Sequence, residues 1–333
     1  MYNYLCMNKK FNIKKIFICL LGFTIVITTS FFCISKAQEK EKLLHFVQIS
    51  DTHLQHSHAK NAERLLGSSE KLIKAEIEQI NNIDDLDFVL GTGDLVDVPE
   101  EALVDKFVEI AMSIKHPFYA VFGNHDVGVN SKVNKKKYIE KFRGYEDAMS
   151  FTDSMPYYSF SPNEKFTVIC LDGTTEKIVT AHGQIDDEQL NWLKDELEKN
   201  KDKFIIIALH FPPIEPYKSD SHFIIEPDRT KLLDLINSYK NVIGVFTGHY
   251  HAARLFKIKN KIYNSCPATV QYPNAFREIT IYKDGPKHIL VDFKWHEINE
   301  PKLREISKNS SRTWKLTEGT SEDKEQKIKL KIY

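Results

Sequence analysis

Cysteine is scarce in this sequence, and the positions of its few cysteines exclude a fold that a framework of disulfide bonds holds together. Three of the five lie in the first 37 residues. The other two, Cys170 and Cys266, allow one disulfide bond between them at most. Cys170 also falls within the apolar run 166–171, where a small buried side chain is the simpler expectation.

A net charge is also missing, because 46 Lys and Arg side chains balance 46 Asp and Glu side chains. Residues 1–37 hold five of the lysines and no acidic residue, so 41 basic and 46 acidic side chains remain in the rest of the chain. A mildly acidic body of this kind is not expected to bind a nucleic-acid polymer or an anionic membrane. The sequence also shows no internal repeat and no long low-complexity linker.

The sequence has one long uninterrupted apolar run, at residues 16–34, and four lysines precede it between Lys9 and Lys15. Small residues at Ser35 and Ala37 offer a cleavage site, so residues 1–37 are typical of a signal peptide cut after Ala37. The run is also long enough to remain as an N-terminal membrane anchor. Either outcome predicts an extracytoplasmic protein, secreted or anchored, that contacts the membrane only through this segment if it is not cleaved. The oligomeric state does not follow from the sequence.

The order of the predicted elements indicates an α/β fold. Strands and helices alternate first, with helices expected at 60–80, 99–114, 131–148, 186–199 and 229–239. After residue 251 the pattern becomes all-β. This order predicts two packed mixed β-sheets flanked by helices, in a domain over residues 42–299. Residues 300–333 are highly charged, and we interpret them as a C-terminal tail of uncertain order.

Five of the predicted strands end in side chains that bind metals or carry protons. The carboxyl ends of strands in an open α/β sheet commonly form one site. The residues that follow these strands are Asp51 and His53, Asp94, Asn124 and His125, His210, and His249 and His251. A mixture of imidazole and oxygen ligands suits Zn, Fe or Mn better than Ca or Mg. The set is too large for one tetrahedral ion but sufficient for two ions that share a carboxylate.

The same residues resemble the motifs of the calcineurin-like metallophosphoesterase superfamily. Its blocks occur here in order, as Asp51-x-His53, Gly93-Asp94-x-x-Asp97, Gly123-Asn124-His125-Asp126, His210 and Gly248-His249-x-His251. The resemblance covers roughly residues 44–296 and implies the four-layer metallophosphoesterase fold. It is similar to the branch of cyclic-nucleotide phosphodiesterases and purple-acid-phosphatase-like enzymes. No tyrosine lies near Asp94, so a purple iron centre is not expected.

The resemblance also implies a role for each residue. The first of two divalent or trivalent metal ions (Mn, Fe or Zn) would be held by Asp51, His53 and His251, the second by Asn124, His210 and His249, and both by Asp94. His125 would stabilise the transition state or protonate the leaving oxygen, and Asp126 would orient its imidazole. Asp97 is expected only to stabilise the loop after Asp94.

These roles predict a binuclear phosphoesterase. It would hydrolyse a small-molecule phosphodiester or phosphomonoester by direct attack of a metal-bridging hydroxide. The alternative is a non-catalytic, metal-containing binding protein on the same fold. The long loop 212–228 follows a predicted ligand, and we hypothesise that Tyr217, Lys218 and His222 in it contact the substrate. His56 and His58 are expected on a solvated loop or at the mouth of the site.

Overall fold

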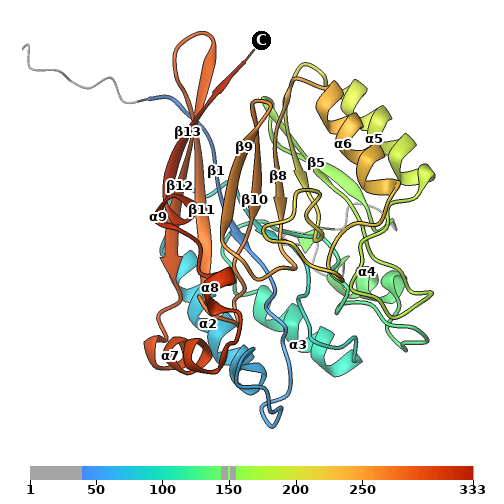
Figure 1. Cartoon of the computed structure of the whole chain (residues 1–333), viewed down its shortest axis with the longest axis vertical. Coiled ribbons are helices and arrows are strands. Elements are labelled where there is room, and N and C mark those ends of the chain that lie inside the picture. The colour runs from blue at the N-terminus through green and yellow to red at the C-terminus, as the bar shows by residue number, and fades with distance from the viewer. Residues whose placement is uncertain (1–39, 144–148, 151–154, 333) are drawn as a thin grey trace, which may run out of the picture. The chain divides into compact units, whose positions relative to one another are not determined.

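The central strands form from continuous apolar runs, and their side chains are buried on both faces of the sheet. In β7 (Phe204–Ala208), Ile205 and Ile207 face one apolar cluster, whereas Ile206 and Ala208 face another. A strand that is apolar on both faces must be covered on both, by a second sheet on one side and by helices on the other. This is the arrangement that the computed structural model shows (Figure 1). It describes residues 40–143, 149–150 and 155–332, so the leader predicted at 1–37 lies outside the described residues.

The described strands form two mixed sheets. The first sheet has seven strands, in the order β13 (Gln326–Lys331), β12 (His288–Glu297), β11 (Ala275–Lys283), β1 (Lys42–Ile49), β2 (Phe88–Gly91), β3 (Phe118–Ala120) and β4 (Met149–Ser150). The second has six, in the order β5 (Tyr158–Asn163), β6 (Phe166–Cys170), β7, β8 (Val242–Thr247), β10 (Lys261–Ser265) and β9 (Arg254–Ile258). The strands β1 to β4 are parallel to one another, and so are β6, β7, β8 and β10.

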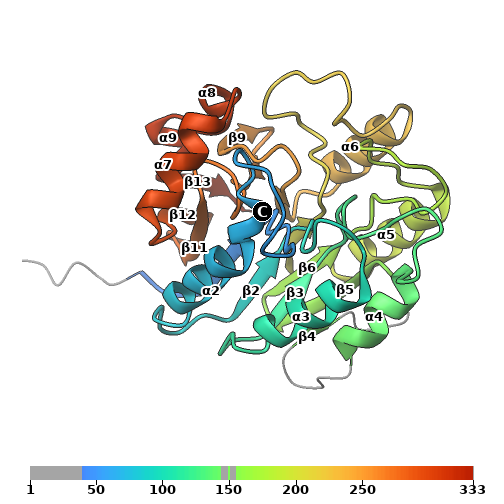
Figure 2. The ribbon, with the colours of Figure 1, turned by 90° about the horizontal axis from the view of Figure 1, so that it is seen from below.

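Helices cover the outer face of each sheet. The first sheet carries α2 (Ser69–Ile80), α3 (Glu101–Ala111) and α4 (Lys135–Arg143), whose buried side chains join the larger apolar cluster. The second carries α5 (Asp187–Lys199) and α6 (Asp228–Ser238), which bury residues such as Leu193 and Leu232 in the smaller cluster. Figure 2 shows α2 and α3 on one outer side and α5 on the other. The predicted α/β fold of two packed, helix-flanked sheets is therefore confirmed.

Two predicted helices begin four or more residues later in the structure. The helix expected from residue 60 begins at Ser69, after the 3₁₀ turn η1 (Leu66–Ser68), and the one expected from 131 begins at Lys135. Apolar residues in a loop can imitate a helical stripe, as Leu65 and Leu66 do here. Cys170 and Cys266 are both buried and free, so the open possibility of a disulfide bond between them is not realised.

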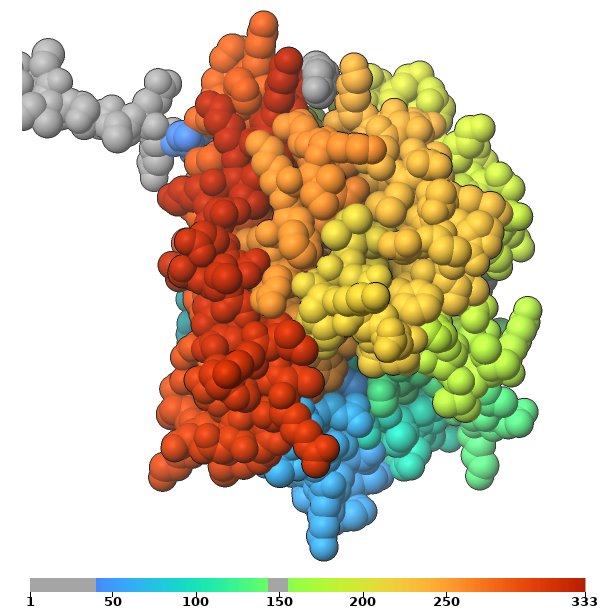
Figure 3. Space-filling view, in the orientation of Figure 1, coloured from blue at the N-terminus to red at the C-terminus, as the bar shows by residue number. Residues whose placement is uncertain are grey.

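The prediction of a C-terminal tail is wrong. Residues beyond 300 form α7 (Pro301–Ser310), α8 (Trp314–Thr317) and α9 (Ser321–Lys324), and β13 then pairs with β12. In Figure 3 this segment, in red, belongs to the same surface as the orange strands. In β13 only Ile328 and Leu330 are buried, and α7 buries Ser307, whose hydroxyl accepts the backbone N–H of Tyr272 at 2.8 Å. Because this segment packs on the rest of the chain largely through polar groups, its sequence shows little hydrophobic periodicity. No helix in the described ranges is both long and apolar enough to traverse a bilayer.

Candidate metal centre and active-site pocket

The predicted site residues lie where five parallel strands end. Asp51 and His53 follow β1, Asp94 follows β2, and Asn124 and His125 follow β3, all three strands being neighbours in the first sheet. The neighbouring strands β7 and β8 of the second sheet are followed by His210 and by His249 and His251. The facing edges of the two sheets therefore bring the predicted side chains together.

The backbone turns sharply at these positions. Positive φ angles, which are uncommon outside glycine, occur at Asp51 (52°), His53 (38°), Asp94 (52°), His249 (68°) and His251 (52°). Strained residues of this kind persist where the surrounding structure determines them, and they are commonly part of a site. Gly93 allows the close approach of the two sheets, because a Cβ there would lie 2.6 Å from His210 Nδ1.

Asp94 is shared by two clusters of potential ligands. One contains Asp51, His53, Asp94 and His251, the other Asp94, His210 and His249, and the ligand atoms within each cluster lie no more than 4.8 Å apart. Asp94 Oδ2 is 3.6 Å from His53 Nε2 in the first cluster and 3.2 Å from His210 Nε2 in the second. Asp94 is therefore the carboxylate that the two clusters have in common.

Hydrogen bonds fix which nitrogen of each imidazole faces the centre. The Nδ1 atoms of His53, His210 and His251 contact Asp97 Oδ1 at 3.1 Å, the Thr92 carbonyl oxygen at 2.7 Å and Gln271 Oε1 at 2.6 Å. An imidazole that donates through one nitrogen keeps a lone pair on the other. Three Nε2 atoms are therefore directed inward.

His249 is held in the opposite sense. Its Nε2 contacts the Ala181 carbonyl oxygen at 2.9 Å, and its Nδ1 lies 3.0 Å from His210 Nε2. Burial lowers the pKa of His53 to about 4 and that of His249 well below its usual range. Both rings are therefore neutral and keep a lone pair for a cation.

Asn124 supplies a further test of whether these residues suit metal ions. Its Oδ1 is buried and has no hydrogen-bond partner in the described structure, yet Asn124 lines the pocket next to Asp94. A buried carbonyl oxygen without a partner is costly, and a bound cation satisfies it. Together with two carboxylates and four imidazoles, this donor set fits two borderline transition-metal ions.

His125 differs from the buried cluster because 31% of its side chain is exposed. Its backbone N–H donates to Asp94 Oδ1 at 2.8 Å, and its Nδ1 lies 2.8 Å from the Asp97 carbonyl oxygen. The ring therefore stands at the mouth of the site with Nε2 free for another partner, which suits a group that exchanges a proton with a bound molecule.

The predicted role of Asp126 is wrong. Its carboxylate points away from the His125 ring and accepts backbone N–H groups at 2.8–3.0 Å from Leu95, Val96 and Gly123. It therefore joins the loop after β2 to the loop after β3. The chain turns at His125, so the side chains of His125 and Asp126 point in different directions. Their adjacency in the sequence therefore did not mean that the two side chains are in contact.

The orienting role falls instead to Asp97, for which the sequence predicted only loop stabilisation. Its Oδ1 lies 3.1 Å from His53 Nδ1 and 3.6 Å from His125 Nδ1, and 3.4 Å from Arg64 Nη1. Burial alone would raise the pKa of Asp97, but the hydrogen bond from His53 and the nearby charges lower it to about 2. The Gly93-Asp94-x-x-Asp97 block was the available signal.

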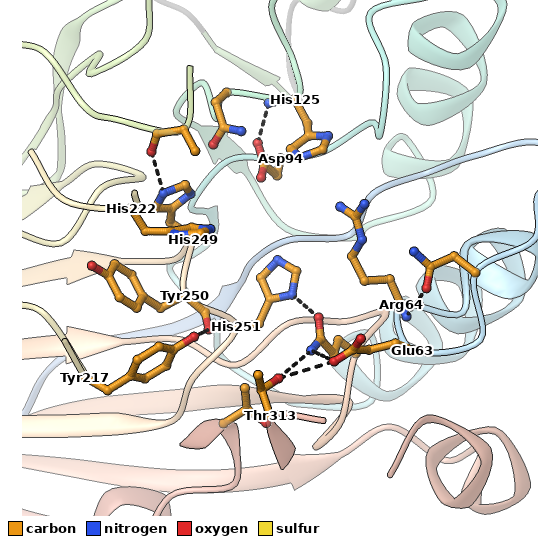
Figure 4. Close-up of a pocket in the computed structure, with 15 residues that line it drawn as sticks. Glu63, Arg64, Asp94, His125, Tyr217, His222, His249, Tyr250, His251 and Thr313 are labelled. Carbon is orange, nitrogen blue, oxygen red and sulfur yellow. Dashed lines mark hydrogen bonds between the residues drawn. The ribbon is translucent and has the colours of Figure 1, made fainter. Parts of the chain in front are cut away.

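A pocket of about 430 Å³ opens above Asp94, Asn124 and His125 (Figure 4). Arg64 is the one Lys or Arg that lines it in the described part of the chain, and its guanidinium points toward the end of the pocket where Asp94 and His125 lie. Tyr217 and His222 of the loop 212–228 also line it, whereas Lys218 does not. His56 and His58 lie outside this lining, on the solvated loop, and His56 pairs with Glu100 at 3.1 Å.

The wall opposite His125 comes partly from the segment that the sequence assigned to a tail. Thr313 and Thr317 line the pocket beside Glu63 and Gln271. Gln271 Nε2 donates to Glu63 Oε1 at 3.3 Å and to Thr313 Oγ1 at 3.4 Å, while Gln271 Oε1 holds His251. Thr313 belongs to no motif, so no sequence signal pointed to it.

Comparison with known proteins agrees with this geometry. The model of the calcineurin-like phosphoesterase family matches residues 44–253. The chain is 29% identical over 212 residues (62% of this chain and 71% of the relative) to a probable glycerophosphodiester phosphodiesterase, GpdQ, of Arcobacter nitrofigilis. It is 25% identical over 224 residues (64% and 72%) to the 3',5'-cyclic adenosine monophosphate phosphodiesterase CpdA of Haemophilus influenzae.

The fold is shared with a solved structure, that of a dimetal phosphatase from Danio rerio. The two align with a TM-score of 0.56 and 16% identity, over 75% of this chain and 96% of the other. The ligand clusters around Asp94 suit the binuclear metal centre of the matched family. The chain therefore belongs to the calcineurin-like phosphoesterase family, whose members are hydrolases acting on phosphoester bonds.

Proposed function

We propose that this protein is a binuclear metal-dependent phosphodiesterase that cleaves a small phosphodiester by direct attack of water on phosphorus. The observation that carries the proposal is the pair of ligand clusters sharing Asp94, with the half-exposed His125 at their mouth. The first ion would be held by Asp51, His53, Asp94 and His251, the second by Asp94, Asn124, His210 and His249. Bound there, the ions would supply an activated water and neutralise charge on the phosphoryl oxygens.

The protein's own groups position the substrate and move the proton. Arg64, anchored by Asp97 at 3.4 Å, would contact a phosphoryl oxygen. His125 keeps Nε2 toward the pocket because Nδ1 is engaged by the Asp97 carbonyl oxygen, and the Asp97 carboxylate places a negative charge 3.6 Å from the ring. His125 would therefore give its Nε2 proton to the leaving oxygen.

A diester is favoured over a monoester by the relatives and by the pocket. The two relatives named above are both phosphodiesterases. The pocket of about 430 Å³ leaves room beyond the phosphoryl group for a substituent, which Tyr217, Thr313 and Glu63 would contact.

The test compares bis-p-nitrophenyl phosphate with p-nitrophenyl phosphate, using protein stripped of metal and refilled with Mn, Zn or Fe. We expect metal-dependent turnover with preference for the diester. His125→Asn should lower kcat by roughly 100-fold or more on a diester with an alkyl leaving group. It should lower kcat much less with p-nitrophenol, which leaves without a proton.

Equal losses on both leaving groups would contradict the role of His125 as proton donor. Preference for the monoester would keep the site but move the protein to the phosphatases. Stoichiometric metal binding without turnover on either compound would instead support the non-catalytic binding protein.

We also propose that the protein acts outside the cytoplasm, secreted or anchored by its N-terminal segment. The support is the sequence of residues 1–37, with lysines before an apolar run and small residues at Ser35 and Ala37. Fractionation of cells and N-terminal sequencing of the mature protein test this. A cytoplasmic protein that still begins at Met1 would contradict it.

A further inference from the structure

A second cavity lies next to the active-site pocket, on the other side of His125. It has a volume of about 690 Å³ and shares Asn124, His125 and Ala181 with the pocket described above. Its other walls come from the loop after β2, from the loop after β3, and from the loop that follows β6: 97–99, 127–131 and 175–180. The proposed proton donor thus stands at the junction of two cavities.

The two cavities differ in chemistry. The active-site pocket is lined by Arg64, Glu63 and hydroxyl and amide groups, whereas the lining of the second cavity includes no Lys or Arg in the described structure. Its aliphatic lining consists of Val98, Pro99, Val127, Val129, Ile178 and Val179.

Aliphatic side chains are unusually exposed in this cavity. Val179 is 93% exposed, Ile178 55% and Val129 37%, and these are three of the eight large hydrophobic residues that are exposed in the described chain. Exposed apolar residues that gather in one concave place commonly mark a binding surface.

The loop that carries Ile178 and Val179 is anchored at both ends. Near its start, Lys135 Nζ donates to Asp172 Oδ2 at 2.5 Å and to the Thr174 carbonyl oxygen at 2.9 Å. At its end, the Ala181 carbonyl oxygen accepts His249 Nε2 at 2.9 Å. Because His249 belongs to the ligand cluster, the apolar wall is tied in position to the metal centre.

We infer that the second cavity receives the leaving arm of the substrate, and that the substrate is a phosphodiester whose leaving arm is apolar. This inference rests on the proposed function, because it uses His125 as the donor to the leaving oxygen. A group protonated by His125 must lie beside that ring, and the cavity on this side is lined mainly by aliphatic side chains, with Asp97, Ser131, Thr175 and Thr180 as the polar minority. The retained arm then lies against the polar wall of the first pocket.

The test measures binding of n-alkyl phosphates from methyl to hexyl to the metal-loaded protein, by calorimetry and as inhibition of bis-p-nitrophenyl phosphate hydrolysis. Each is a phosphoryl group bearing one arm of known length. We expect affinity to rise about two- to fourfold per methylene, the increase that burial of a methylene gives.

Ile178→Asp should remove most of this dependence on chain length while leaving the affinity for methyl phosphate unchanged. Ile258→Asp is the matched control, because Ile258 is also an exposed isoleucine (37%) but lies at the end of β9 outside both cavities. The control should keep the full dependence.

Two results would overturn the inference while leaving the proposed function intact. One is methyl phosphate binding and diester turnover with no gain from longer chains. The other is a gain that persists unchanged in Ile178→Asp, which would place the chain elsewhere. Failure of every alkyl phosphate to bind, together with absence of diester turnover, would instead refute the proposed function and this inference with it.

Discussion

The floor and the wall of the active-site pocket are built in different ways. The floor consists of the ligand clusters around Asp94, which follow four parallel strands within the matched residues 44–253. The wall consists of Glu63, Gln271, Thr313 and Thr317, of which the last three lie beyond that match. The floor repeats one local device, a buried strand ending in a sharp turn, whereas the wall is assembled from loops and short helices.

If the proposed function holds, chemistry and selectivity are carried by separate parts of this chain. The floor has the groups that suit two metal ions, and the wall has groups that would contact only the substrate's substituent. Gln271 connects them, since it holds His251 at 2.6 Å on one side and Glu63 and Thr313 on the other. Substitutions in the floor should therefore reduce turnover broadly, and substitutions in the wall should mainly change substrate affinity.

The largest effect is expected at the shared carboxylate. Asp94→Asn keeps an oxygen for the backbone N–H of His125 but removes the charge that both clusters share. Loss of a residue that only holds a metal ligand in place costs up to about 100-fold. Asp94 is proposed as a ligand itself, so we expect kcat/KM for bis-p-nitrophenyl phosphate to fall by more than roughly 100-fold. Metal content per chain, measured by mass spectrometry after dialysis, should also fall. Full metal content with full activity would show that Asp94 does not bridge.

Asp97→Asn should have the next largest effect, because Asp97 holds both a cluster imidazole and the proposed proton donor. Loss of such a partner typically costs about 10- to 100-fold in metal affinity or activity. Asp105→Asn is the matched control, since that carboxylate is 57% exposed and pairs with Lys141 on the outer helices. Equal activity of the two variants would return Asp97 to the loop role that the sequence predicted.

The contrast between floor and wall also explains how far the sequence could be interpreted. Asp51, His53 and His210 each come within four residues of the end of an apolar strand, so the apolar runs and a list of ligand types were enough to predict that they meet. The helix-flanked sheets could be predicted because strands and helices alternate along the chain. Local sequence could not show that the carboxylate beside His125 is Asp97 and not Asp126, because that depends on how two loops turn.

The wall of the pocket could not be predicted either, and the physical reason is different. Thr313 reaches the pocket because α7 docks through hydrogen bonds such as that of Ser307 to the carbonyl oxygen of Glu63, at 2.7 Å. Contacts of this kind connect residues more than 200 positions apart and leave no hydrophobic periodicity. A charged segment with few apolar residues is typical of disorder, and here polar contacts and the strand β13 order it instead.

Gln271→Leu tests the connection between the two regions. The leucine has a similar size but offers no oxygen to His251 Nδ1, so the imidazole loses the partner that fixes its orientation. We expect about a tenfold loss of metal affinity, measured by titration with a competing chelator, and a comparable fall in kcat. An increase in KM alone, with metal affinity unchanged, would place Gln271 in the wall only.

Thr313→Val tests the wall by itself, since valine keeps the shape and removes the hydroxyl. The pocket loses one polar contact, so KM for a diester with a hydroxyl-bearing arm should rise by about three- to tenfold, the effect of one hydrogen bond. Metal content and kcat should stay within about twofold of the parent protein. A diester with two p-nitrophenyl arms serves as the control substrate, and an equal rise in KM for both would argue against a contact with the arm.

Glu76 should affect activity least, because it lies beneath the loop that joins floor and wall and touches neither ion site nor pocket. Its Oε2 accepts the Thr269 hydroxyl at 2.8 Å, and burial raises the pKa of Glu76 from 4.5 to about 8. The folded protein therefore keeps this proton over a range in which the unfolded chain has lost it. The stability linked to the proton is fully present below about pH 4.5 and is lost as the pH rises to about 8.

Glu76→Gln should remove this part of the pH dependence while leaving kcat/KM within about twofold. The measurement is the free energy of unfolding in urea at pH 5, 7 and 9 for the parent and the variant. The glutamine variant should gain stability relative to the parent between pH 5 and about 8, with little further gain at pH 9, because it has no proton to lose. If the difference between the two proteins is the same at all three values, Glu76 has the same pKa in the folded and the unfolded protein, and the proton is not held by burial.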